Sequence, residues 1–248
     1  MPIQYFANRV PRAQVPAIDR VLAKRKILTA TGSANTASNA LSTVISSDVD
    51  WQVDNIQFTF SNANSRTFSI SIKNGRRIVA GLNDYFCVLV DGFAYEGITL
   101  SPGFYSGDEL ATEMQTQLNA DVNFAAATLT FTVTYDAATG VFTITPSAST
   151  IKYIALNTTT FRWYADSTAG CVIGFANNSS SFASSVVSDT NVYGLNTTIT
   201  LASQPASTAL TYVRDTVDTL SMDQAILLSS NAGADVTVDY IVTYEALV

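Results

Sequence analysis

The sequence contains no histidine among its 248 residues, and this absence excludes much of enzyme chemistry. Ser-His-Asp and Cys-His nucleophile systems need an imidazole base, and most zinc and non-haem iron sites use imidazole ligands. The phosphate-binding glycine loops of P-loop and dinucleotide-binding proteins are missing too, as is the G-x-S-x-G nucleophile turn. We therefore expect that the protein is not an enzyme and that it takes no cofactor and no metal.

Charged residues are also scarce. They make up 13% of the sequence, against roughly a quarter in typical soluble domains. Serine, threonine and asparagine supply the polarity instead, and the apolar fraction is 47%. This balance is typical of β surfaces that are neutral enough to pack against other proteins. No apolar run approaches the length of a membrane span, and the first residues lack the apolar core of a secretory signal, so we expect neither.

The few basic residues are concentrated at the start of the chain. Six of the 13 lysines and arginines lie within the first 26 residues and only Asp19 opposes them, so this arm carries a net charge of +5. The remaining seven basic and 19 acidic residues give the rest of the chain −12. The arm is either a solvated tail or a segment that docks on an acidic neighbour, which is packaged nucleic acid or another subunit. The candidate partner-binding residues are Arg9, Arg12, Arg20, Lys24, Arg25 and Lys26.

The sequence predicts two regions. Residues 1–47 form the basic arm and its linker, in which residues 17–28 are expected to make a short basic helix and TATGSANTASNA a flexible connection. Residues 48–248 form the body. Its first strand signal, WQVDNIQFTF, changes phase between Val53 and Ile56, which indicates a β-bulge or a bend. A hairpin turn is expected at Asn74-Gly75, and the continuous apolar run YFCVLV is typical of a strand covered on both faces.

One amphipathic helix is expected near 106–119. Ser106 and Glu109 have the spacing of a capping box. Leu110, Met114 and Leu118 then recur every four residues and make one narrow apolar stripe. Such a helix needs a surface to cover, and an open sheet edge or the end of a sandwich provides one.

The segment TLTFTVTYDAATGVFTIT predicts a strong hairpin, with alternate residues of both strands facing one way. Further short strands are expected at 151–156, 161–164, 198–202 and 209–214, and the last one includes VTVDYIVTYEAL. About ten short strands separated by turns favour an all-β protein, a β-sandwich of jelly-roll type with one short helix.

Two groups of side chains remain open to more than one interpretation. The carboxylates Asp48/Asp50/Asp54 and Asp215/Asp218/Asp223 are solvated strand ends, or else they bind calcium or cleave glycosides; the first interpretation is favoured because no calcium-loop pattern is present. Cys87 and Cys171 lie in apolar runs without metal-site spacing, so we expect buried free thiols, although a disulfide between them stays possible.

Residues 98–175 resemble a module of virion structural proteins from double-stranded DNA viruses and phages, which are capsid or capsid-associated β-sandwich proteins. The resemblance comprises the G-x-Y-S start of the helix, the Tyr-Asp-x-x-Thr-Gly hairpin and a small-residue turn that ends in Gly-Phe. The matching positions are Gly103, Tyr105, Ser106, Leu110, Tyr135, Asp136, Thr139, Gly140, Phe142, Ile144, Gly174 and Phe175.

The resemblance implies a structural subunit of a virus or phage particle: a capsid, penton, cement or head-associated protein located in the virion. It would assemble as a homo-oligomer and with other virion proteins, through its body and its arm. The alternative is a receptor- or carbohydrate-binding module of a viral fibre or adhesin, with Tyr95, Phe104, Tyr105, Trp163 and Tyr164 as candidate sugar-stacking aromatics. A glycan-cleaving enzyme is the third and weakest hypothesis.

Overall fold

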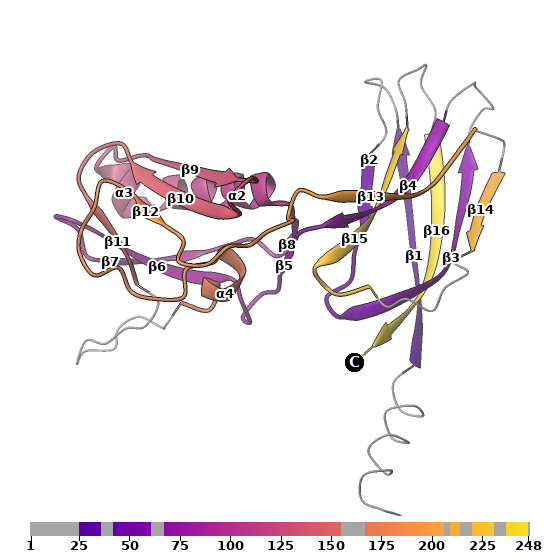
Figure 1. The fold of residues 1–248 in the computed structure, drawn as a ribbon, viewed down its shortest axis with the longest axis horizontal. Coiled ribbons are helices and arrows are strands. Elements are labelled where there is room, and N and C mark those ends of the chain that lie inside the picture. The colour runs from indigo at the N-terminus through magenta and orange to yellow at the C-terminus, as the bar shows by residue number, and fades with distance from the viewer. Residues whose placement is uncertain are drawn as a thin grey trace, which may run out of the picture. The chain divides into compact units, whose positions relative to one another are not determined.

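The computed structural model describes residues 25–35, 42–60, 67–154, 167–205, 209–213, 220–230 and 237–247. Strands predominate over helices in the part of the chain that the structure describes. The strand pairings whose registers are described are all antiparallel (Figure 1). The predicted all-β class is therefore confirmed.

The chain divides into two compact units, where the sequence predicts a single body over residues 48–248. Unit 1 comprises residues 1–70, 200–222 and 226–248, and unit 2 comprises residues 71–199 and 223–225. Unit 2 is thus an insertion in the sequence of unit 1.

Unit 1 contains most of two four-stranded sheets, whose strand orders are β1-β16-β3-β14 and β13-β4-β15-β2. The strands of the first sheet are β1 (Arg25–Asn35), β3 (Asp50–Phe60), β14 (Ala209–Val213) and β16 (Thr237–Leu247). Those of the second are β2 (Ser42–Ile45), β4 (Thr67–Asn74), β13 (Thr198–Pro205) and β15 (Gln224–Ser230).

Strands β1 and β2 lie within the residues that the sequence assigns to the arm and linker. β1 pairs with β16 along its whole length, from Arg25 opposite Leu247 to Asn35 opposite Thr237. The expected helix end at residues 25–28 and the first part of the expected linker are therefore wrong, because this stretch obtains hydrogen-bond partners from the sheet. Lys26 lies opposite Ala246. Arg9, Arg12, Arg20 and Lys24 lie outside the described residues.

The bulge predicted in β3 is confirmed. Thr243 of β16 lies opposite Asn55 and the next residue, Tyr244, lies opposite Val53, so one residue of β3 is extra at this point. The extra residue lets apolar side chains on both sides of it face the core, because it corrects the phase of the pleat. The buried residues of β3 are Trp51, Val53, Ile56 and Phe58.

Unit 2 contains three small sheets with the orders β12-β10-β9, β11-β6-β7 and β5-β8. Its strands are β5 (Arg76–Ile78), β6 (Tyr85–Val90), β7 (Tyr95–Thr99), β8 (Gly103–Tyr105), β9 (Phe131–Asp136), β10 (Val141–Pro146), β11 (Ile151–Ile154) and β12 (Val186–Val187). Its helices are α2 (Gly107–Ala120), α3 (Val122–Ala126) and α4 (Gly170–Ile173). The strands expected at 151–156, 198–202 and 209–214 form as β11, β13 and β14; residues 161–164 lie outside the described part.

The hairpin turn predicted at Asn74-Gly75 is wrong. β4 ends at Asn74, and β5 pairs with β8 rather than with β4. The Gly75 N–H donates to the Asp223 carbonyl oxygen at 3.0 Å. A Cβ at Gly75 would collide with the Tyr105 carbonyl oxygen and the Phe104 ring. Glycine is therefore required here for close backbone approach and not for a two-residue turn.

Helix α2 forms where the sequence predicts it. Its stripe is fully buried: Leu110, Met114 and Leu118 have no exposed surface, and Ala111 is also buried. Burying each of the three large side chains contributes about 2 kcal/mol. These residues join the core of unit 2 together with β6, β9 and β10.

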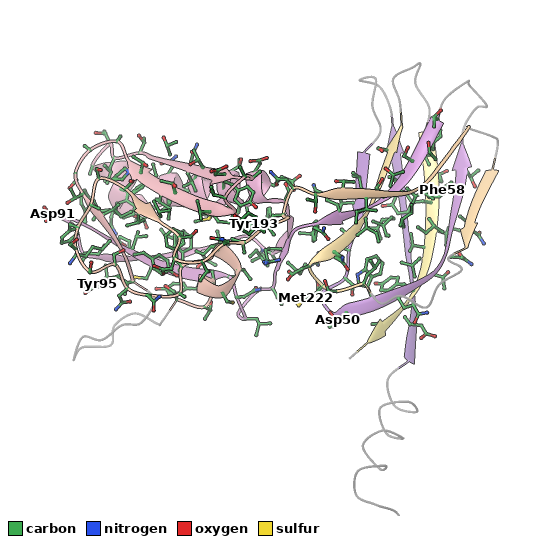
Figure 2. All side chains as sticks on the ribbon, viewed as in Figure 1. Asp50, Phe58, Asp91, Tyr95, Tyr193 and Met222 are labelled. Carbon is green, nitrogen blue, oxygen red and sulfur yellow. The ribbon has the colours of Figure 1, made fainter. Side chains whose placement is uncertain are left out.

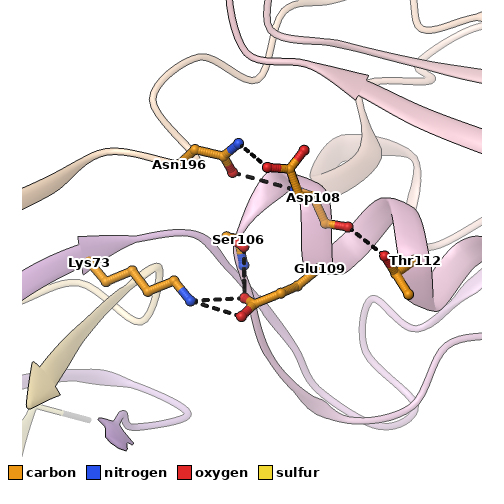
Figure 3. Close-up of polar contacts among 6 residues, drawn as sticks. All are labelled: Lys73, Ser106, Asp108, Glu109, Thr112 and Asn196. Carbon is orange, nitrogen blue, oxygen red and sulfur yellow. Dashed lines mark hydrogen bonds and ion pairs between the residues drawn. The ribbon is translucent and has the colours of Figure 1, made fainter. Parts of the chain in front are cut away.

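The capping box fixes the first turn of α2 (Figure 3). The Glu109 carboxylate accepts hydrogen bonds from the Ser106 N–H and hydroxyl, each at 2.7 Å, and pairs with Lys73 Nζ at 3.0 Å. Asn196 lies on the other side of this turn and donates to Asp108 Oδ2 at 2.7 Å. Burial is the largest influence on the pKa of Glu109 and raises it, but the bonds from Ser106 and the Lys73 charge together bring the pKa below its ordinary value.

Replacing Glu109 with glutamine should lower the free energy of unfolding by about 1 kcal/mol at neutral pH, because the cap loses its charge. Screening keeps the effect this small, since the Glu109 side chain is 51% exposed. A carboxyl whose pKa is lowered on folding stabilises the protein above its unfolded pKa, and this stabilisation is lost as the pH falls through the folded pKa. The difference in the free energy of unfolding between wild type and variant should therefore shrink as the pH falls.

Denaturant titration at several pH values measures this gap. Asp91→Asn, which removes one exposed carboxylate from a turn of the same unit, is the matched control and should stay near the wild-type value throughout. A Glu109→Gln gap that is independent of pH would contradict the electrostatic role of the cap.

Candidate protein-interaction site

The hairpin of β9 and β10 has one buried and one exposed face. Phe131, Val133 and Tyr135 of β9 are buried, as are Phe142 and Ile144 of β10. The predicted inward-facing residues are thus confirmed. Because side chains alternate along a strand, the residues between them must face outward.

The outward side chains are mostly threonines and lie in rows. Thr132 lies opposite Thr145, and Thr134 lies opposite Thr143. β12 extends the second row with Val187, which lies opposite Thr143 and is 53% exposed. We call this surface the threonine face; it consists of Thr132, Thr134, Val141, Thr143, Thr145 and Val187.

The six residues of the threonine face are uncharged, although the chain has a net charge of −7. The face ends at Asp136, the next outward-facing residue of β9, which lies opposite Val141 at the turn end of the strand. Its carboxylate accepts from the Thr139 hydroxyl at 2.6 Å and from the Ala138 N–H at 2.9 Å. The Thr139 bond, and then the Ala138 bond, lower the pKa of Asp136. The Asp136 carboxylate is therefore bonded within the hairpin turn.

A face of this composition suits contact with another protein surface. Threonine and valine are β-branched, so their side chains are already restricted and lose little entropy on being covered. Threonine hydroxyls donate and accept hydrogen bonds without the desolvation cost of a charge. Tyr193 is 59% exposed and lies against Gly140, at the turn end of the same hairpin (Figure 2).

The free edge of β9 is closed by helix α2. The Phe131 N–H donates to Asn119 Oδ1 at 2.7 Å, and Asn119 Nδ2 donates to the Phe131 carbonyl oxygen at 3.3 Å. The Val133 N–H donates to Gln115 Oε1 at 3.0 Å. The two amide side chains thus take the place of a neighbouring strand, as the expected covering of a sheet edge requires. A partner can approach the face of this sheet but cannot add a strand at β9.

Two aromatic contacts hold the helix in this position. At its start, Gly107 packs against the Tyr135 ring so closely that a Cβ would collide with it. The Tyr135 hydroxyl donates to the Val192 carbonyl oxygen at 2.8 Å. Beyond its end, Phe124 of α3 packs against Phe131, with ring centroids 4.9 Å apart.

The predicted carboxylate groups have structural partners where they are described. Asp50 Oδ1 accepts a hydrogen bond from the Met222 N–H at 3.1 Å; both residues are labelled in Figure 2. Asp223 accepts from the Arg77 N–H at 3.1 Å and pairs with Arg76 at 3.4 Å. Asp215, Asp218 and the side chain of Asp54 lie outside the described part. Within the described residues, no three acidic or cysteine side chains gather as metal ligands would.

The cysteines are both free thiols, so the disulfide that the sequence left open does not form. Cys87 is buried in β6, as expected, and burial followed by the nearby Glu96 charge raises the pKa of its thiol to about 11. Cys171 is exposed on α4, so the expectation that it is buried is wrong. The apolar run around it is a single helical turn in which its neighbours, and not Cys171 itself, face the core.

The three candidate sugar-stacking aromatics that the structure describes are not fully exposed. Tyr95, Phe104 and Tyr105 are half-buried, and the Tyr105 hydroxyl donates to the Ser101 carbonyl oxygen at 2.9 Å. Trp163 and Tyr164 lie outside the described residues. Neither the exposed Tyr193 nor the threonine face was predicted from the sequence. The alternation of threonine with large apolar residues in TLTFTVTY was the signal that could have indicated the threonine face.

Replacing Gln115 and Asn119 together with alanine should destabilise unit 2 by about 1–3 kcal/mol, because the Phe131 and Val133 amides lose their partners. Hydrogen exchange at these two amides should accelerate more than at the rest of β9. The exposed edge should also promote association at high protein concentration. Thr116→Ala, at an exposed position of the same helix, is the control; equal exchange rates in both variants would show that the edge is not closed by the amides.

Comparisons with known proteins do not assign the chain to a family. No family model matches the chain, and no curated protein matches it. Within the described residues, no helix is long and apolar enough to cross a membrane. The function must therefore be argued from the strand topology and from the surfaces described above.

Proposed function

We propose that the protein is a structural subunit of a virus or phage particle, a capsid, penton, cement or head-associated protein. In this proposal unit 1 is a jelly-roll β-sandwich, and unit 2 supplies a further contact surface through the threonine face. The protein works by assembly and has no catalytic activity. The observation that carries the proposal is the order of the strands in the two sheets of unit 1.

That order is the one a jelly roll requires. The two sheets draw on eight strands, which in chain order are β1, β2, β3, β4, β13, β14, β15 and β16. Numbered one to eight, they are arranged 1-8-3-6 in one sheet and 5-4-7-2 in the other. A chain that folds as two interlocked Greek keys produces this alternation, in which the first and last strands are neighbours. Unit 2 is inserted between the fourth and fifth strands.

Jelly rolls occur in viral capsid proteins, in lectins and in cupins. Cupin enzymes bind metal mainly through histidine, which this sequence lacks. The motifs of residues 98–175 that resemble virion proteins all lie in unit 2. The low charge of the chain and the neutral threonine face favour a protein that is buried among other proteins. Together these points favour a particle subunit over a metal-dependent enzyme.

A receptor- or carbohydrate-binding module remains the second candidate. Tyr193 supports it, because a tyrosine ring that is 59% exposed is a platform on which a sugar ring can stack. The two functions differ in what Tyr193→Ala changes. A binding module would lose glycan affinity while a particle subunit would keep its place in the assembly.

Replacing Thr134 with lysine tests the threonine face as an assembly contact. Thr134 is exposed and lies opposite Thr143, the middle residue of one row of the face, so the variant should fold normally but place a charge where a neutral partner must pack. When tagged variant and wild type compete for incorporation into particles, the variant should be depleted at least about tenfold, which corresponds to about 1.4 kcal/mol.

The matched control is Thr116→Lys, which introduces the same side chain at an exposed position of α2. Equal incorporation of Thr134→Lys and wild type would remove the threonine face from the proposal. Retained incorporation with a changed preference for glycans would favour the second candidate.

The arm is tested by two deletions. Removing residues 1–24 spares β1 and should leave a folded protein that is incorporated poorly, because four basic residues are lost: Arg9, Arg12, Arg20 and Lys24. Removing residues 1–35 also deletes β1 and should lower the thermal stability of unit 1. If the 1–24 deletion competes equally with the full chain, the arm does not dock.

The salt dependence of incorporation identifies the partner of the arm. Contacts with nucleic acid phosphates weaken steeply as salt rises. Docking on protein through the apolar residues of the arm should change little over the same range.

A further inference from the structure

The second feature that points to a partner is the free edge of strand β1. In the sheet β1-β16-β3-β14, β1 is terminal and, within the described residues, pairs only with β16. It is 11 residues long, whereas β14 at the opposite edge has five. Every second residue of an edge strand directs its N–H and C=O away from the sheet, and these groups are a template for another strand.

The sequence of β1 lacks the features that usually protect an edge. Proline, charge and bulges discourage strand addition, but RKILTATGSAN has no proline and carries charge only at Arg25 and Lys26. Its register with β16 shows no shift. Unit 2 closes the edge of β9 with helix α2, whereas no described residue covers the longer edge of β1.

We propose that β1 pairs antiparallel with β1 of a second copy of this chain, which joins the two sheets across a twofold axis at Ala30. Full overlap of residues 25–35 requires that centre, because Ala30 is the middle of the strand. The inference concerns the oligomeric state of the pure protein and does not depend on the proposed role in a particle.

Charge placement selects the antiparallel direction. In a parallel pair, Arg25 and Lys26 would lie opposite the same residues of the second copy, and like charges directly opposite are destabilising. In the antiparallel pair they lie opposite Asn35 and Ala34. The two Arg25 positions are then about 30 Å apart along the strands, well beyond the screening length of roughly 8 Å.

The same register brings opposite charges together. Ser33 pairs with Asp239 of β16, which is exposed. In the joined sheet, Arg25 of one copy and Asp239 of the other occupy the same face, with about 12 Å between their Cα atoms, because they are two strands and two residues apart. The twofold axis repeats this pair on the other side.

The centre of the joined sheet provides a charge-swap test. With the axis at Ala30, Thr29 of one copy lies opposite Thr31 of the other. Their partners on β16 are Thr243 and Ile241; Ile241 is 43% exposed, so this face of the sheet is open to solvent and accepts charged substitutions. Thr29→Lys with Thr31→Lys places like charges opposite each other, whereas Thr29→Lys with Thr31→Glu places opposite charges there.

The experiment measures the dimer dissociation constant of the full chain by sedimentation equilibrium. We expect wild type to dimerise, the double-lysine variant to bind itself at least tenfold more weakly, and the lysine–glutamate variant to stay within about threefold of wild type. Circular dichroism and thermal melting check that both variants fold. Hydrogen exchange of the wild type should be measured at low and at high protein concentration. The alternate β1 amides that point away from β16 should become protected only in the dimer.

Four results would overturn the proposal. The first is a wild-type chain that stays monomeric at concentrations of 100 µM, about the top of the range for a specific protein contact. The second is a double-lysine variant that dimerises as well as wild type. The third is equal weakening of both variants, which would exclude pairing of Thr29 with Thr31 and hence the axis at Ala30. The fourth is a β1 strand whose amides keep the same protection from hydrogen exchange at low and high protein concentration, which is incompatible with strand pairing.

Discussion

The backbone of β9 needs hydrogen-bond partners along its free edge, and most features of unit 2 follow from the way α2 supplies them. Gln115 and Asn119 are four residues apart and therefore lie on one side of the helix. They reach Phe131 and Val133 only if the helix lies along the edge with its stripe of Leu110, Met114 and Leu118 on the core. The cap at Ser106 fixes where this helix begins. The outer face of the hairpin is then left as its open surface.

Features that depend on local pattern could be predicted from the sequence. The phase change between Val53 and Ile56 specified the bulge in β3, because burial on one face fixes the register of a strand. The box at Ser106 and Glu109 specified the start of α2. Strand partners were not predictable in this way. Asn74-Gly75 has the composition of a hairpin turn, but a tertiary constraint, the approach of Tyr105 and Phe104, accounts for the glycine.

The same distinction applies to the candidate sites. Net charge along the chain marked the first 26 residues as unusual, but it could not show that Arg25 and Lys26 belong to a strand, since that depends on β16 more than 200 residues later. Alternation in the hairpin specified which residues are buried. It also specified the exposed threonines, whose significance becomes apparent only when the register with β10 and β12 places them in rows.

The two proposed contact surfaces, one in each unit, would restrict a partner in different ways. At an open strand edge, a partner must satisfy a series of backbone hydrogen bonds, so its direction and register are fixed. At a neutral, β-branched face, packing and a few hydroxyl bonds are enough, so several partner orientations have similar energies. A chain with both surfaces can form one contact of defined geometry and another that adapts to its neighbour. In the particle subunit proposed above, this combination would let identical chains repeat one contact while they adjust others to local curvature.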